Sequence, residues 1–270
     1  MVESFERRFG GLRRLYGVAG AQRIFDAHVV VVGIGGVGSW AVEALARSGV
    51  RQLTLIDLDH VSESNINRQI HALDATLGQA KAQAMRERIA QFHPGCLVHL
   101  IDDFVTPDNW PAVLGAHATR PSAVIDACDQ VRAKTVMAAW AKDEGVSFVA
   151  VGAAGGKRRA QTVEIADLAD VTHDPLLAQM RYRLRKEHGA PRTKRMSVAC
   201  VFSREAVAPP DASCSVEPGD GSLNCHGYGS VVSVTASFGL CAAGWVMNAL
   251  AESDSTFQVT SKHAQNDAII

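Results

Sequence analysis

The feature that most constrains the fold is the stretch AHVVVVGIGGVGSWAVEALARSGV, residues 27–50. The apolar run at 29–32 suits a strand buried on both faces, and the residues after Gly36 read as a helix that Gly49 ends. Between them, Gly33, Gly35, Gly36 and Gly38 form a G-x-G-x-x-G turn, which lets the backbone approach a phosphate at a helix N-terminus. The stretch therefore predicts a nucleotide-binding strand–turn–helix unit.

Strands and helices continue to alternate after this unit. Further strands are expected at 53–59, 97–104, 122–129 and 146–156, with helices at 78–92 and 131–145. This order predicts an α/β fold with a doubly wound, mostly parallel, Rossmann-like sheet. We expect one domain over residues 1–270, with a nucleotide-binding half at 1–156. The half at 157–270 is less regular, carries a flexible loop at about 203–228, and is expected to serve substrate binding and dimerisation.

Composition narrows the class of protein. The chain has 270 residues, a net charge of −1 and 47% hydrophobic residues, as globular proteins do, so a histone-like nucleic-acid binder is disfavoured. Its six cysteines include no C-x-x-C pair, and the N-terminus has no apolar signal region, which favours the cytoplasm. Residues 229–250 carry no charge and are long enough to cross a bilayer. Their polar and small residues favour a helix buried in the core or in a homodimer interface over a membrane contact.

The stretch SNINRQIHA, residues 64–72, suggests which nucleotide is used. Asn65, Asn67, Arg68 and Gln69, together with Lys81, supply donors for the charge that develops when ATP is cleaved at its α-phosphate. An NAD site needs no such cluster. Two carboxylates complete the predicted site. Asp57 follows the second strand, where it can bind ribose hydroxyls, and Asp129 follows the fourth, where it can bind Mg²⁺.

These motifs resemble the E1-like adenylating enzymes. The resemblance rests on GIGGVGS, LIDLDHVSESNINRQ, GQAKA and DACD. Within that family the chain is most similar to the tRNA threonylcarbamoyladenosine dehydratases, through RFGGLRRLYG, NINRQIHAL, FVTPDN, GAAGG and DPLLAQMRYRLRK followed by VFSREA. The resemblance implies a ligase-type enzyme that uses ATP and Mg²⁺ to dehydrate N6-threonylcarbamoyladenosine in tRNA to its cyclic form through an acyl-adenylate. It further implies that Asp57 binds ribose, that Asn65, Arg68 and Lys81 act on the phosphates, and that Asp129 binds the metal.

Several alternatives remain open from the sequence. Adenylation of the C-terminal glycine of a ubiquitin-like sulfur carrier needs the same ATP site, but the paired C-x-x-C zinc motifs of those activators are missing. A sulfur-transfer protein is therefore a candidate partner only. An NAD-dependent oxidoreductase and a non-catalytic nucleotide-binding scaffold are the rivals from other classes. Relatives also place an N-terminal arginine in the partner subunit's phosphate site, and Arg8, Arg13 and Arg14 are equal candidates.

Two further features bear on the substrate. Residues 181–195 hold seven cations, of which Arg181, Arg183, Arg185 and Lys186 are expected to contact tRNA phosphates. The alternative is a solvated helix face. Cys225, in a glycine-rich loop, is a candidate nucleophile because thioester-forming E1 enzymes use such a cysteine, and an incidental loop cysteine is the other interpretation.

Overall fold

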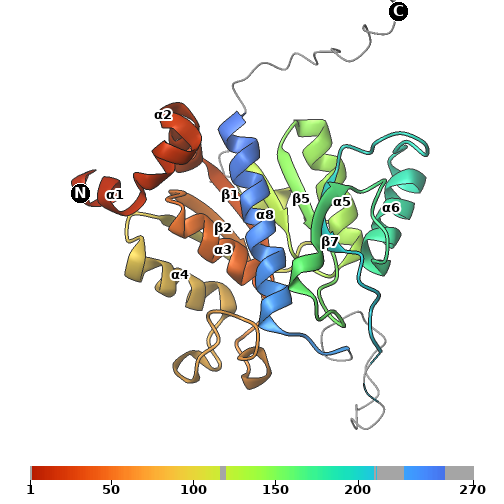
Figure 1. Ribbon diagram of the computed structural model, residues 1–270, viewed down its shortest axis with the longest axis horizontal. Coiled ribbons are helices and arrows are strands. Elements are labelled where there is room, and N and C mark those ends of the chain that lie inside the picture. The colour runs from red at the N-terminus through yellow and green to blue at the C-terminus, as the bar shows by residue number, and fades with distance from the viewer. Residues whose placement is uncertain (1, 116–119, 210, 212–227, 253–270) are drawn as a thin grey trace, which may run out of the picture.

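The computed structural model describes residues 2–115, 120–209, 211 and 228–252. Its centre is a seven-stranded sheet in the order β3-β2-β1-β4-β5-β7-β6, with helices on both faces (Figure 1). The strands are β1 His28–Val32, β2 Gln52–Ile56, β3 Leu97–Ile101, β4 Ala123–Asp126, β5 Ser147–Val151, β6 Val163–Asp167 and β7 Ala199–Ser203. The helices are α1 Val2–Phe9, α2 Gly11–Asp26, α3 Gly38–Arg47, α4 Lys81–Phe92, α5 Val131–Glu144, α6 Pro175–Glu187 and α8 Val232–Glu252. All strand pairs are parallel except β6 with β7, which confirms the predicted doubly wound, mostly parallel fold.

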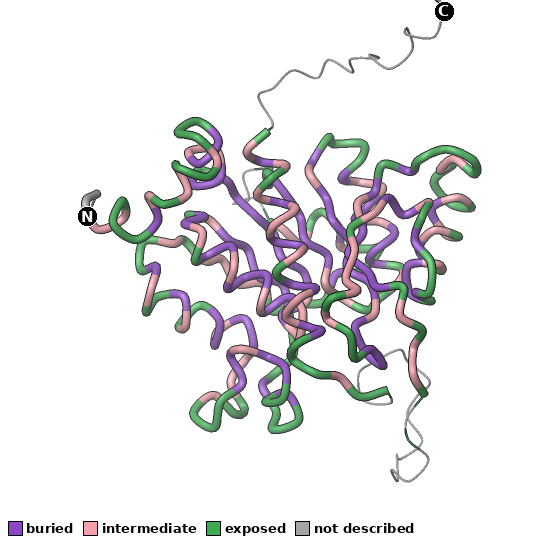
Figure 2. Tube along the Cα trace, in the orientation of Figure 1, coloured by how far each residue is buried: buried purple, intermediate pink, exposed green. Residues whose placement is uncertain are grey.

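The sheet separates two hydrophobic cores, and β1 contributes to both. Val29 and Val31 pack with the helices α3, α4 and α8, whereas Val30 and Val32 pack with α5 and α6. Successive side chains of a strand point to opposite faces, so a strand covered on both sides must be apolar at every position. The unbroken valine run is explained by this two-sided burial, because all residues of β1 are buried. The buried colour follows the central strands in Figure 2.

The uncharged segment at 229–250 forms the long helix α8, as predicted. Its inner side chains Val234, Phe238, Ala242 and Val246 are fully buried against α2, α3 and the sheet. At Gly239 the helix passes so close to α3 that a Cβ would collide with the carbonyl oxygen of Val37. By length and composition α8 could cross a membrane, yet half of its most apolar window is buried within the chain. Packing against its own sheet and helices therefore accounts for much of the apolar character of α8.

Three parts of the architecture were not predicted. The N-terminal residues form α1 and α2, and β7 lies between β5 and β6, with β6 antiparallel to it. The basic segment is only partly helical, since α6 ends at Glu187. Gly189 adopts a positive φ of 62° and Pro191 follows, which together prevent the helix from continuing.

Candidate active site

A pocket of about 730 Å³ opens at the carboxyl ends of β1, β2, β4 and β5. The strand order reverses next to β1: β2 and β3 follow it on one side of the sheet, and β4 and β5 on the other. Open α/β sheets bind ligands at such a reversal of strand order. Nine of the predicted site residues line the pocket, namely Gly33, Gly35, Gly36, Asp57, Asn65, Arg68, Gln69, Lys81 and Asp129.

The glycine turn forms the floor next to β1. Gly33 has a φ of +85°, and a Cβ there would lie 2.9 Å from the backbone of Ala127, so only glycine fits. At Gly36 a Cβ would lie 3.2 Å from the side chain of Arg68, which packs over the turn. Gly38 does not line the pocket. A Cβ there would collide with the carbonyl oxygen of Gly33, so this glycine allows the tight packing of the turn against the start of α3.

Asp57 joins the end of β2 to the glycine turn. Its carboxylate accepts hydrogen bonds from the backbone N–H groups of Ile34 and Asp59, which hold it at the pocket wall. Burial raises the pKa of Asp57, and the nearby Lys81 ammonium and the two N–H donors oppose that rise. Each carboxylate oxygen can accept more than one hydrogen bond, so Asp57 retains capacity for a ligand hydroxyl.

The turn at residues 62–69 buries three polar side chains beside the glycine turn. Asn65 and Gln69 are 5% exposed and Arg68 is 9% exposed. Arg68 donates from Nη1 to the carbonyl oxygen of Ser64 at 2.7 Å and to Asn67 Oδ1 at 3.0 Å. Within the described residues, Arg68 Nε and Gln69 Oε1 are buried without a hydrogen-bond partner. Unsatisfied buried polar atoms in a pocket wall indicate that a polar ligand completes them.

Lys81 is the first residue of α4 and is 6% exposed. Its ammonium forms an ion pair with Asp59 at 2.7 Å, and its backbone N–H donates to the carbonyl oxygen of the same residue. Asp59 thus places the Lys81 ammonium in the pocket wall, where an anionic ligand would compete with the carboxylate for it.

Asp129 lies at the exposed edge of the pocket, three residues beyond the last residue of β4. Its carboxylate has one weak contact, from Gln130 Nε2 at 3.4 Å. Among the described residues there is no group of three acidic, His or Cys side chains that could hold a metal alone. A single exposed carboxylate at the edge of a pocket large enough for a nucleotide fits Mg²⁺, which is commonly bound through one or two carboxylates plus phosphate oxygens and water.

Some predicted residues lie elsewhere. Asn67 is exposed, donates to the carbonyl oxygen of Ser230 at 2.9 Å and does not line the pocket. Cys225 lies outside the described residues. Arg181 is a correction to the predicted tRNA surface, because its guanidinium donates to the carbonyl oxygens of Leu168 and Val171.

The other three predicted tRNA contacts share α6 with Arg181. Arg183 pairs with Glu187 at 2.8 Å, and Arg185 donates to the carbonyl oxygens of Pro191 and Arg192. Lys186 is exposed over the ring of Tyr182. Part of the basic segment therefore stabilises its own fold.

The structure adds pocket residues that sequence reasoning missed. Asp59, Arg132 and the loop 103–108 also line the pocket. Arg132 is exposed, and within the described chain its guanidinium has no hydrogen bond or ion pair. Their places in the sequence could have indicated them. Asp59 and the 103–108 loop follow the ends of predicted strands, and Arg132 comes three residues after Asp129.

His71, between the 62–69 turn and α4, gives the protein a predicted pH response. It is 1% exposed, both ring nitrogens lack a partner among the described residues, and burial, with Lys81 and Arg88 nearby, lowers its pKa from 6.5 to about 4. Between these values the unfolded chain binds a proton that the folded protein excludes, so stability should fall as the pH drops from about 6.5 to about 4. The full loss is about 3 kcal/mol.

Urea unfolding of the wild type and of His71→Gln at pH 7 and pH 5 would test this response. The variant should lose about 2 kcal/mol less than the wild type between the two pH values. His93, whose pKa burial also lowers, is present in both proteins and cancels. Equal losses in the two proteins would contradict the assignment.

The sequence and the fold are both similar to those of known proteins. The ThiF family profile matches residues 8–269. The chain is 44% identical over 249 residues to the tRNA threonylcarbamoyladenosine dehydratase of Escherichia coli (strain K12), covering 89% of this chain and 92% of that protein. The crystal structure of the E. coli enzyme, TcdA, in complex with ATP superposes with a TM-score of 0.82 at 42% identity, covering 93% of this chain and 96% of that one. The similarity to the molybdopterin-synthase adenylyltransferase of Salmonella typhimurium is shorter, at 38% identity over 112 residues, or 42% of this chain and 43% of that protein.

Proposed function

The chain belongs to the ThiF family, and we propose that it is an ATP-dependent enzyme that dehydrates N6-threonylcarbamoyladenosine in tRNA to its cyclic form. One observation carries the choice of substrate. The similarity to the dehydratase of Escherichia coli runs across nearly its whole length, whereas the similarity to a molybdopterin-synthase adenylyltransferase covers less than half of either chain. The pocket supports the shared ATP step, and the second half of the chain supports the dehydratase over the sulfur-carrier activator.

In the proposed reaction the threonyl carboxylate attacks the α-phosphate of ATP. A carboxylate–phosphorus bond forms, the bond to pyrophosphate breaks, and pyrophosphate leaves. The carbamoyl group of the same modification then attacks the activated acyl carbon. Ring closure expels AMP, so the modification loses one water while ATP becomes AMP and pyrophosphate.

We assign the pocket residues to this reaction as follows. The glycine turn approaches the phosphates through its backbone, and Asp57 accepts hydrogen bonds from the ribose. Asn65, Arg68, Gln69 and Lys81 donate to phosphate oxygens, where charge increases in the transition state. Asp129 would hold Mg²⁺, which supplies charge neutralisation at the phosphates when bound.

Asp129→Ala should leave the fold intact and reduce AMP formation by at least about a hundredfold, because a metal clamp on the phosphates is worth several kcal/mol. The side chain is exposed and has one weak contact, so its removal costs little stability. Asp143→Ala, an exposed carboxylate on α5, is the matched control and should retain wild-type activity. AMP release measured across a magnesium titration separates the two variants. Near-normal turnover of Asp129→Ala at limiting magnesium would reject the metal assignment.

The proposed tRNA surface includes the half-buried Arg183 and the exposed Lys186 of α6, and extends to the exposed cations at 192–195. The exposure of Lys186, Arg192 and Lys194 supports this proposal. Arg181 and Arg185 are left out because each guanidinium donates to two backbone carbonyl oxygens.

We also propose a cytoplasmic homodimer in which the outward faces of α2 and α8 meet a second copy. Leu15 and Val18 of α2 are 76% and 69% exposed, and Leu240 of α8 is 49% exposed. Arg14 lies beside them without a bond in the described chain, whereas Arg8 and Arg13 are bonded to Phe92 and Glu6, which favours Arg14 as the arginine offered to a partner subunit. A sulfur-transfer protein as a further partner stays a prediction.

The decisive experiment incubates the protein with ATP and tRNA that carries threonylcarbamoyladenosine. Mass analysis of the nucleosides should show loss of one water from the modified nucleoside, with one AMP formed for each. Unchanged nucleosides, together with pyrophosphate exchange that depends on a small carrier protein, would support the sulfur-carrier reaction in place of the dehydration.

A further inference from the structure

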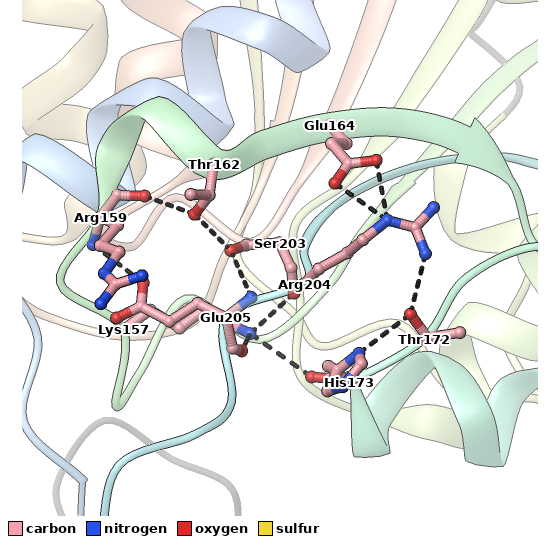
Figure 3. A network of polar contacts seen from close by, with 9 residues as sticks. All are labelled: Lys157, Arg159, Thr162, Glu164, Thr172, His173, Ser203, Arg204 and Glu205. Carbon is pink, nitrogen blue, oxygen red and sulfur yellow. Dashed lines mark hydrogen bonds and ion pairs between the residues drawn. The ribbon is translucent and has the colours of Figure 1, made fainter.

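The loop after β5 carries three consecutive cations, Lys157, Arg158 and Arg159, which differ in burial. Lys157 and Arg159 are drawn in Figure 3. Lys157 is 2% exposed, whereas both arginines are exposed. Within the described chain neither guanidinium of Arg158 and Arg159 has a hydrogen bond or an ion pair. One cation is therefore structural, and two are available to a ligand.

Lys157 fastens this loop to two neighbouring segments. Its ammonium donates to the carbonyl oxygens of Ser203 at 3.0 Å and Glu205 at 2.7 Å, and to that of His173 at 3.4 Å (Figure 3). Ser203 ends β7, and His173 lies just before α6. The buried lysine thus holds the loop at the junction of these two elements.

Glu205 fixes the backbone of the two arginines. Its carboxylate accepts hydrogen bonds from the backbone N–H of Arg158 at 3.1 Å to each oxygen, and from that of Arg159 at 2.9 Å. The buried ammonium of Lys157 lies near the carboxylates of Asp174 and Glu205. Glu205 therefore holds the backbone of Arg158 and Arg159, while within the described chain no carboxylate pairs with either guanidinium.

This pair lies next to the pocket. Residues 152–155 line the pocket wall, and Arg158 follows Gly155 by three residues, a reach of at most about 10 Å along the chain. Gly156 lies between the pocket wall and the arginine pair. Its backbone N–H donates to the carbonyl oxygen of Gly229 at 3.0 Å, and its carbonyl oxygen accepts from the N–H of Ala208 at 2.8 Å. These two hydrogen bonds fix the backbone that joins the wall to the arginines.

The proposed substrate requires cations at such an edge. A nucleotide whose modified base reaches into the pocket carries a phosphate on each side, and those phosphates remain outside. We propose that Arg158 and Arg159 bind the tRNA backbone phosphates that flank the modified nucleotide. This inference rests on the proposed function and adds a contact at the pocket edge to the more distant surface on α6.

Arg204 supplies a matched control from the same network. It follows the end of β7, and its guanidinium donates to Glu164 at 3.0 Å and to Thr172 at 3.1 Å (Figure 3). Because its charge is already paired, Arg204→Ala should not remove a phosphate contact. Arg158→Ala/Arg159→Ala, in contrast, should remove two.

The test measures binding of threonylcarbamoyladenosine-containing tRNA as a function of salt, together with ATP affinity. The double variant should flatten the log–log salt slope by about 1.4 to 1.8 and weaken tRNA binding at 0.15 M salt by roughly tenfold, with ATP affinity unchanged. Arg204→Ala should keep the wild-type slope.

Two other outcomes would overturn the proposal. If the double variant binds tRNA with wild-type affinity and slope while the wild type still converts it, these arginines are not phosphate contacts and the proposed function stands. If the wild type neither binds nor converts the tRNA, both the contact and the proposed function are wrong.

Discussion

Replacing Arg68 with alanine should slow formation of the acyl-adenylate by about 10²- to 10³-fold, the cost of removing one preorganised donor from a site where negative charge develops. The guanidinium is 9% exposed, packs over Gly36 of the glycine turn, and has a buried Nε without a partner in the described chain. It is therefore held in place before the nucleotide arrives.

AMP release in the presence of the modified tRNA measures this effect, and thermal unfolding confirms that the variant is folded. Arg68→Lys, which retains the charge but loses the planar fork, should fall between alanine and wild type. Arg86→Ala, an exposed arginine on α4 outside the pocket, should retain full activity. An Arg68→Ala enzyme within threefold of wild type would show that this side chain does not stabilise the transition state.

The largest expected loss of stability comes from a different residue, Lys134. Its ammonium and the Asp126 carboxylate form an ion pair at 2.9 Å with both side chains 0% exposed, beneath the pocket loop that carries Asp129. Lys134→Met should lower the free energy of unfolding by about 3 to 5 kcal/mol, because the Asp126 carboxylate would stay buried without its counter-charge.

Urea unfolding of a double-mutant cycle tests this prediction. Lys134→Met/Asp126→Asn removes both charges and should be less destabilised than Lys134→Met alone. Lys142→Met changes an exposed lysine of the same helix and should cost less than about 0.5 kcal/mol. If Lys134→Met were as stable as Lys142→Met, the buried pair would not contribute to the fold.

The strand ends were the predictable part of the site. Asp57 and Asp129 follow strands of a parallel sheet, and the carboxyl ends of such strands meet at one edge. Their proximity therefore follows from the strand order alone. The glycine spacing likewise indicated where the backbone must turn.

The residues between strands were less predictable. Asn67 and Arg68 are neighbours in the sequence, but a short 3₁₀ turn at Glu63–Asn65 sets the backbone so that only Arg68 faces the pocket. The hydrogen-bond partners of a cation could not be predicted from the sequence either. The carbonyl oxygens that accept from Arg181 belong to the loop between β6 and α6. Charge density along the chain could not separate Arg181, whose guanidinium donates to two carbonyl oxygens, from Arg158, whose guanidinium has no partner among the described residues.

The central position of β1 also sets the order in which the sheet can assemble. Val29 pairs with Leu53 of β2 on one side and with Ala123 of β4 on the other. A chain that emerges from the ribosome N-terminus first can thus form a three-stranded sheet of β1, β2 and β3 before β4 has been synthesised. Until then Val30 and Val32 lack the cover of α5, and closing the long loop to β4 is an entropic cost that slows folding. On the opposite face Val29 and Val31 wait longer still, because they pack with α8, the last helix of the described chain to be synthesised.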